Sequence, residues 1–144
     1  MTDQEIILSI VIPLYNEARR VEHSLEKALQ YLEALRSSYE VILVNDGSSD
    51  GTLNILQRFA SKNDNLIILQ NARNCGKGYS IKRGVLSARG VYVLFTDIDF
   101  SVPVETISQF LTELRKGCPI VIGSRNILGA RVEKYQPFMR RLLG

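Results

Sequence analysis

Residues 41–52 read VILVNDGSSDGT, an apolar run that gives way at Asn45 to a polar, glycine-rich segment. Four consecutive Val, Ile and Leu residues are typical of a strand that is buried on both faces of a sheet. The glycines and serines that follow favour tight turns. Leu53, Leu56 and Phe59 then predict the inward face of a helix. We interpret the stretch as a strand, a turn and a helix in succession.

The same order of elements recurs along the chain. Apolar runs of strand length occupy residues 6–12, 41–44, 66–69, 91–95 and 120–122. Helices are expected from near Glu17, after Asp50, over residues 79–88 and from Pro103, which is a favourable first helical residue. The first helix has the clearest apolar face, formed by Val21, Leu25, Ala28, Leu32 and Leu35. Strands that alternate with helices predict an α/β fold, a mainly parallel sheet flanked by helices and wound in both directions through right-handed crossovers.

Composition limits the class of protein. The chain has 144 residues, of which 45% are hydrophobic and 23% are charged, and this excludes collagen-like, disulfide-rich and disordered classes. The length suits one domain over residues 1–144. The longest apolar stretch, residues 6–14, is interrupted by Ser9 and Pro13 and is shorter than the roughly 20 residues that a membrane span needs. We therefore expect no membrane-spanning segment.

Two further features point to the cytoplasm. Residues 1–5 carry acidic side chains where a secretory signal would be basic. Cys75 and Cys118 do not have the spacing of a metal site or a redox motif. We expect both to be free thiols in a reducing cytosol.

Positive charge is concentrated near the end of the chain. Residues 1–124 hold 13 Lys and Arg against 14 Asp and Glu, whereas residues 125–144 hold 5 against 1. A solvated basic end is one interpretation, and a site for phosphate or for an anionic membrane surface is the other. Nothing in the charge pattern by itself decides between them.

Polar segments follow every predicted strand, at residues 13–17, 45–52, 71–78, 97–101 and 123–126. Ligands of open α/β sheets bind outside the carboxyl ends of the strands. We therefore expect all five segments to meet along one rim, where the functional site would lie.

Asp97 and Asp99 follow the predicted strand over residues 91–95. Two carboxylates at a strand end suit Mg²⁺ or Mn²⁺, which completes its coordination shell with water and substrate phosphates. The alternative is a polar turn that caps the helix at Pro103. An Asp-x-Asp pair does not separate these interpretations by itself.

Asp46 and Lys77 lie in two other strand-end segments. Asp46 stands directly at a strand end, where its carboxylate can accept hydrogen bonds from the N–H groups of a nucleotide base. Further along the same segment, Ser49 or Asp50 is expected to cap the next helix. Lys77 lies in NCGKG (residues 74–78), which is not a phosphate-binding P-loop, because that motif needs Ser or Thr where Gly78 stands. Lys77 is a candidate contact for a diphosphate, and the alternative is a solvated side chain.

Five motifs together carry a resemblance to a known family. VIPLYNE (residues 11–17), VNDGSSDGT (44–52), NCGKG (74–78), DID (97–99) and GSR (123–125) resemble, in order and spacing, the family 2 glycosyltransferases of Rossmann-like GT-A fold. Within that family the chain looks most similar to the polyprenyl-phosphate (dolichyl-phosphate) mannosyl- and glucosyltransferases. The resemblance covers essentially the whole chain.

The resemblance implies roles for named residues. Pro13, Tyr15 and Glu17 would contact the nucleoside and Asp46 the base. Catalytic roles would fall to Asp97 and Asp99, which would hold the metal and the donor diphosphate, and to Arg125 and Arg140, which would face the acceptor phosphate. Two departures stand out: Asn45 occupies a usually acidic position, and Ser101 stands where some mannosyltransferases have Gln, which favours a glucosyltransferase-like donor site.

The implied reaction is the inverting transfer of a hexose from UDP-glucose or GDP-mannose to a polyprenyl phosphate. Such an acceptor is ionised at neutral pH, so no general base is needed, and Mg²⁺ or Mn²⁺ would neutralise the departing diphosphate. The alternatives are another sugar or polysaccharide acceptor, and a nucleotide-binding module without catalysis. The chain resembles the donor-binding part of a catalytic domain truncated at its C-terminal side. We expect it at the cytoplasmic membrane face, bound through its basic end, with no nucleic-acid partner.

Overall fold

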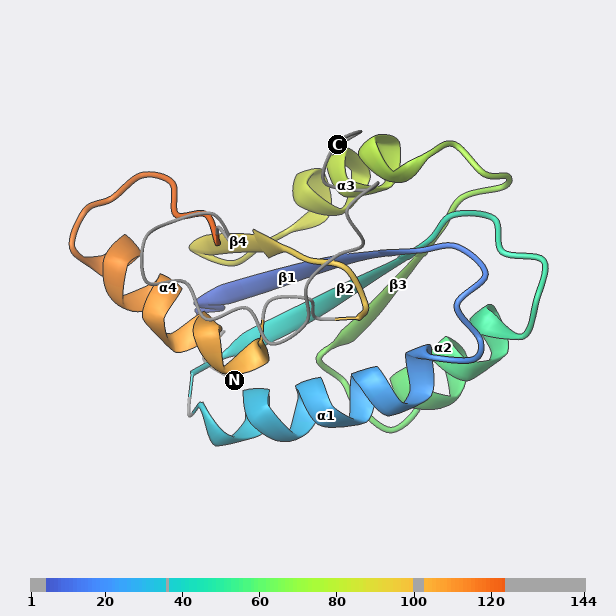
Figure 1. Cartoon of the computed structure of the whole chain (residues 1–144), viewed down its shortest axis with the longest axis horizontal. Coiled ribbons are helices and arrows are strands. Elements are labelled where there is room, and N and C mark those ends of the chain that lie inside the picture. Colours follow the sequence, from blue (N-terminus) through green and yellow to red (C-terminus); the bar gives the residue numbers. More distant parts are fainter. Residues whose placement is uncertain (1–4, 36, 100–102, 124–144) are drawn as a thin grey trace, which may run out of the picture.

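The computed structural model of the chain describes residues 5–35, 37–99 and 103–123. Within these ranges strands and helices alternate as predicted (Figure 1). The elements, in chain order, are β1 (Leu8–Leu14), α1 (Val21–Ala34), β2 (Tyr39–Asn45), α2 (Thr52–Ala60), β3 (Leu66–Gln70), α3 (Lys77–Ser87), β4 (Tyr92–Phe95), the short 3₁₀ helix η1 (Val104–Thr106) and α4 (Ile107–Arg115).

The four strands form one parallel sheet in the order β3-β2-β1-β4. The helices α1 and α2 cover one face of the sheet and α3 lies on the other (Figure 1). Right-handed crossovers require this arrangement, because the chain moves outward from β1 to β3 and then returns past β1 to form β4. The direction of winding therefore changes between β1 and β4. The predicted α/β class, with its parallel sheet and flanking helices, is confirmed.

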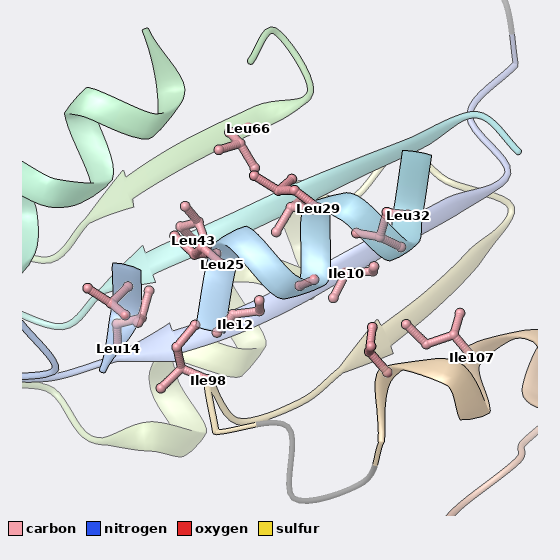
Figure 2. Close-up of a cluster of buried hydrophobic side chains, with 14 of the residues drawn as sticks. Ile10, Ile12, Leu14, Leu25, Leu29, Leu32, Leu43, Leu66, Ile98 and Ile107 are labelled. Atoms are coloured by element: carbon pink, nitrogen blue, oxygen red, sulfur yellow. The ribbon is translucent and has the colours of Figure 1, made fainter. Parts of the chain in front are cut away.

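The larger part of the core lies between the sheet and α1 (Figure 2). The predicted apolar face of α1 is correct, since Val21, Leu25, Ala28 and Leu32 are buried and Leu35 is half-buried. The predicted start near Glu17 is wrong, because residues 18–20 form a turn and the helix begins at Val21. The Val21 N–H nevertheless donates to the Glu17 carbonyl at 2.9 Å, which explains why the pattern extends back to that residue.

Other boundaries differ by a few residues. Helix α3 begins at Lys77, two residues before its predicted start. Pro103 precedes the single 3₁₀ turn η1 rather than opening an α-helix. In α2, Leu56 is buried, whereas Leu53 and Phe59 are half-buried.

The fifth predicted strand does not form. Residues 120–122 have no regular secondary structure, and the side chains of Ile120 and Ile122 are 79% and 81% exposed. An apolar run becomes a strand only where a neighbouring strand accepts its backbone hydrogen bonds, and β4 pairs only with β1 within the described residues. The sequence pattern shows propensity but not the presence of that partner.

An ion pair between the buried carboxylate of Glu40 and the exposed guanidinium of Arg89 fixes β4 against the sheet, at the end opposite to the predicted site. Glu40 in β2 is buried, and its carboxylate accepts hydrogen bonds from Ser9 Oγ at 2.7 Å and from the Arg89 backbone N–H at 2.7 Å. The Arg89 guanidinium donates to the other oxygen at 2.8 and 3.0 Å. Gly90 passes so close to Ser9 that an added Cβ would lie 2.6 Å from the Ser9 nitrogen. These contacts set the position from which β4 starts.

No helix in the described ranges is both long and apolar enough to cross a membrane. Cys75 and Cys118 are free and exposed, in agreement with the prediction of free thiols.

Candidate functional site

The carboxyl ends of the four strands bring four polar loops to one edge of the sheet. These loops follow β1 at residues 15–20, β2 at 46–51, β3 at 71–76 and β4 at 96–99. Parallel strands make this meeting unavoidable, because all of their carboxyl ends point the same way. The described parts of four of the five predicted rim segments therefore lie together, and residues 100 and 101 of the fourth segment fall outside the described residues. Most of the fifth, residues 124–126, falls outside the described residues.

The loop after β1 turns at Asn16, which has a φ of 55°. Asparagine tolerates this left-handed conformation better than most residues, because its side chain can bond locally. Here the Asn16 N–H donates to Ser48 Oγ at 3.0 Å, and Asn16 Oδ1 accepts from the Ser49 N–H at 2.9 Å. The loops after β1 and β2 are thus joined at the turn itself.

Asp50 strengthens this junction. Its Oδ2 accepts from the Ala18 N–H at 3.1 Å, its Oδ1 accepts from the Thr52 N–H at 3.0 Å, and Thr52 Oγ1 in turn accepts from the Glu17 N–H at 2.8 Å. Ser49 or Asp50 was predicted as the N-cap of α2, but Gly51 occupies that position. Asp50, one residue before Gly51, still accepts from the N–H of Thr52, the first residue of the helix. The contact of Asp50 with the loop after β1 was not predicted from the sequence.

The three residues predicted to contact a nucleoside lie on or beside this junction. Pro13 is half-buried in β1, opposite Val44. Tyr15 is exposed at the start of the loop. Glu17 forms an ion pair with Arg20 at 2.8 Å. No contact in the structure tests their predicted role, which stays a prediction.

Asp46 is 3% exposed, and both of its carboxylate oxygens are engaged. Oδ1 accepts from Asn71 Nδ2 at 2.6 Å and from the Cys75 N–H at 2.9 Å, and Oδ2 accepts from the Gly76 N–H at 2.9 Å. Burial raises the pKa of Asp46, but hydrogen bonds from Asn71, Cys75, Gly76 and Ser80 outweigh this effect and hold it below its usual range. The charged carboxylate therefore fastens the loop after β3. Its predicted contact with a base is a separate matter and stays a prediction.

Asn71, Ser80 and Arg83 extend this network. Asn71 Nδ2 also donates to Ser80 Oγ at 3.0 Å, and Asn71 Oδ1 accepts from the Arg83 guanidinium. None of the three was predicted from the sequence as a site residue. The available signal was positional: Asn71 follows β3 directly, just as Asp46 follows β2.

Lys77 and Asp97, predicted separately, lie in contact. The ammonium of Lys77 is 2.6 Å from Oδ1 and 2.8 Å from Oδ2 of Asp97. Both side chains are about half exposed, so the carboxylate faces solvent and a cation at once. The arrangement shows that both oxygens of Asp97 are presented outward from the end of β4.

Ile98 separates the two predicted metal ligands and is itself buried in the core (Figure 2). Asp97 and Asp99, on either side of it, are exposed. An apolar residue anchored between two acidic ones fixes the backbone of the turn. The predicted acceptor-side residues Arg125 and Arg140 lie outside the described residues.

Comparison with known proteins agrees with this geometry. The family described as Glycosyl transferase family 2 matches residues 9–141 of the chain. A dolichyl-phosphate beta-glucosyltransferase of Trichomonas vaginalis is 32% identical over 97% of the chain and 46% of its own length. The dolichyl-phosphate beta-glucosyltransferase of Homo sapiens is 33% identical over 94% of the chain and 46% of its own length. The chain thus spans less than half the length of these curated relatives.

Solved structures share the fold. TarS of S. aureus (residues 1–349) in complex with UDP superposes with a TM-score of 0.65 at 27% identity, covering 77% of the chain and 32% of TarS. The mannosyltransferase PcManGT from Pyrobaculum calidifontis, in complex with GDP-Man and Mn²⁺, superposes with a TM-score of 0.58 at 22% identity, covering 74% of the chain and 31% of that protein. The fold is that of the GT-A glycosyltransferases, as the sequence motifs implied.

Proposed function

Because the chain belongs to glycosyl transferase family 2, we propose that residues 1–144 form the donor-binding part of an enzyme that transfers a hexose from a nucleotide sugar to a polyprenyl phosphate. The observation that carries the proposal is the contact between Lys77 and Asp97 at the carboxyl edge of the sheet. It brings together a cation and a carboxylate beside the loops that hold Tyr15 and Asp46. A nucleoside diphosphate can bind the ammonium directly and the carboxylate through a divalent cation.

Asp97 and Asp99 suit a divalent cation. Both are exposed at the end of β4, and Asp97 already turns both oxygens toward a positive charge. Among the described residues no three His, Cys, Asp or Glu side chains gather as a metal site, so two carboxylates would leave the other positions to water and donor phosphates. Mg²⁺ accepts such a shell. When bound, Mg²⁺ or Mn²⁺ would supply positive charge to the leaving diphosphate.

The proposed donor is UDP-glucose, with GDP-mannose as the alternative. Relatives named dolichyl-phosphate beta-glucosyltransferase, at about one-third identity, support glucose, and TarS was solved with UDP. The residue at position 101 favours the same choice, because Ser101 stands where some mannosyltransferases have Gln.

The proposed acceptor is a polyprenyl phosphate, and the proposed reaction is a single displacement that inverts the anomeric carbon. The phosphate oxygen is already ionised and attacks without a general base. Arg125 and Arg140 would bind it through paired hydrogen bonds. The names of the relatives support this acceptor. The basic residues 125–144 would hold the protein at an anionic membrane on the cytoplasmic side.

Calorimetry tests the donor half of the proposal. UDP should bind the chain more tightly with Mg²⁺ or Mn²⁺ than with a chelator, and Asp99→Asn should remove that difference. Asp64→Asn, an exposed carboxylate between α2 and β3, serves as the control and should leave it intact. The proposal is contradicted if the affinity for UDP is the same with metal as with chelator, and the affinity for GDP is likewise unchanged.

A transfer assay tests the acceptor half. In the protein at its natural length, Arg125→Lys should impair transfer to polyprenyl phosphate while sparing UDP binding, and Arg140→Lys should do so to a smaller degree. Efficient transfer to a neutral sugar, unaffected by either change, would leave the family assignment standing and overturn the acceptor.

A further inference from the structure

Asn71 is a buried polar side chain beside the proposed donor site, and no role in that site yet explains it. It is 3% exposed and directly follows β3. Its backbone N–H donates to the Asn45 carbonyl at 2.9 Å, which continues the pairing of β2 and β3 by one residue. The position of Asn71 is therefore fixed by the sheet rather than by the loop.

The side chain of Asn71 joins groups of different chemistry. Its Nδ2 donates to Asp46 Oδ1 at 2.6 Å and to Ser80 Oγ at 3.0 Å, and its Oδ1 accepts from the Arg83 guanidinium. Only an amide offers two donors on one side and an acceptor on the other. A carboxylate at this position would face Asp46 with like charge, and an alanine would leave a buried carboxylate short of a donor.

Asp46 passes this restraint to the next loop. Its two oxygens accept from the backbone N–H groups of Cys75 and Gly76, each at 2.9 Å. The same loop also packs against Gly47, where an added Cβ would lie 2.4 Å from the Arg73 carbonyl carbon. The residue that follows Gly76 is Lys77, whose ammonium reaches Asp97.

We infer that Asn71 is a positioning residue, which holds Asp46 and through it the 73–76 loop so that Lys77 is delivered to the diphosphate side of the site. The inference deepens the proposed function and rests on it, because Lys77 acts on a diphosphate only if the chain binds a nucleotide sugar. Asn71 itself touches neither Lys77 nor Asp97 among the described contacts. Its effect is transmitted through hydrogen bonds to a carboxylate and two backbone amides.

Hydrogen exchange of the Cys75 and Gly76 amides measures the first step. Asn71→Ala should speed the exchange of both amides by about tenfold, the effect of weakening one charge-assisted hydrogen bond. Arg83→Met, a change at a half-buried position of α3, should act in the same direction by a smaller factor and keeps the test open if Asn71→Ala does not fold. Asn54→Ala, on the exposed side of α2, is the control and should change neither amide.

A double-mutant cycle measures the second step. Lys77→Met should weaken binding of UDP with Mg²⁺ by about tenfold relative to uridine, because it removes a cation from the diphosphate side. In the Asn71→Ala background the same change should have little further effect, since Lys77 is no longer held in place. Arg83→Met provides the same cycle in a second background.

The outcomes separate the two proposals. Unchanged exchange at Cys75 and Gly76, or additive effects of Asn71→Ala and Lys77→Met on UDP binding, overturns the positioning role while UDP binding itself stands. Failure of the unaltered chain to bind UDP or GDP overturns the proposed function and this inference with it, whatever the exchange rates show.

Discussion

The Lys77 ammonium lies within 2.8 Å of both carboxylate oxygens of Asp97. The first residue of α3 therefore neutralises a carboxylate in the loop that follows β4. The two residues are 20 apart in sequence. They meet because α3 begins at the carboxyl edge of the sheet, and β4, which lies parallel beside β1, ends at the same edge. A cation at this place resembles in charge the metal that the site is proposed to bind. The pair is exposed, so its contribution to stability is small and it is easily displaced.

Lys77→Met should therefore raise the affinity of the chain for Mn²⁺ in the absence of nucleotide, by about two- to fivefold. The change removes a competing positive charge from Asp97 without altering a buried residue. Titration followed by electron paramagnetic resonance measures free Mn²⁺ directly. Lys82→Met, on an exposed turn of the same helix, is the matched control. Unchanged or weaker Mn²⁺ binding in Lys77→Met would show that Lys77 does not compete for this carboxylate.

Glu40→Gln should destabilise the fold by about 1–3 kcal/mol at pH 7, because it removes the charge that Ser9 and Arg89 recognise. Burial raises the pKa of Glu40, but the hydrogen bonds from Ser9 and Arg89 outweigh it and hold the pKa below its usual range. A lowered pKa contributes stability that is present above the unfolded-state value of about 4.3 and is lost as the pH falls through the folded-state value.

The difference in unfolding free energy between the original chain and Glu40→Gln should therefore shrink as the pH falls below about 4. Urea unfolding at several pH values measures it. Glu26→Gln, an exposed change on α1, controls for general effects of lost negative charge. A difference that stays constant down to pH 3 would mean that the carboxylate charge of Glu40 does not contribute.

The sheet was predictable because its central strands are buried on both faces. In a run such as residues 41–44 every side chain is apolar and buried, so the pattern indicates a strand covered on both faces. The polar residue that follows the run marks the carboxyl edge of the sheet. The carboxyl ends of parallel strands likewise predict that Asp46, Lys77 and Asp97 lie at one rim. Residues 120–122 have a similar apolar pattern and form no strand, because pairing depends on a neighbour that a local pattern cannot reveal.

Long-range polar pairing was not predictable. Glu40 lies 49 residues from Arg89 in sequence, and nothing in the strand pattern connects them. Asn71 looked like the first residue of an ordinary loop, since its importance comes from an Asp46 carboxylate 25 residues earlier. Motif resemblance identifies residues that touch a ligand more readily than residues that hold those contacts in place.

Gly47→Ala should destabilise the chain and weaken UDP binding, whereas Gly51→Ala in the same loop should be nearly neutral. Gly47 has a φ of 69°, and a Cβ there would collide with the Arg73 and Asn74 backbone. Gly51 has a φ of −70°, and its nearest atom is the Ala18 Cβ at 3.8 Å. Strain of this kind costs about 1–3 kcal/mol, which thermal unfolding resolves. Equal melting temperatures for the two variants would contradict the close packing of the 73–76 loop on Gly47.

Asp46 offers a test that separates a base contact from a loop restraint. Its carboxylate is buried and already accepts from Asn71, Cys75 and Gly76, so any substitution disturbs the loop. The nucleotide can be changed instead. N3-methyl-UDP has no base N–H to donate, so it should bind the original chain about tenfold or more weakly than UDP.

The predicted base contact then requires that Asp46→Asn, which keeps the shape of the side chain, reduces the preference for UDP over its N3-methyl form. If Asp46 only fastens the loop, Asp46→Asn weakens both nucleotides by the same factor and leaves the preference intact. Asp50→Asn is the comparison, because it loosens the neighbouring junction of the loops after β1 and β2 without removing a carboxylate from the end of β2. It should leave the preference unchanged, so a preference reduced by Asp46→Asn and kept by Asp50→Asn would place the base N–H at Asp46.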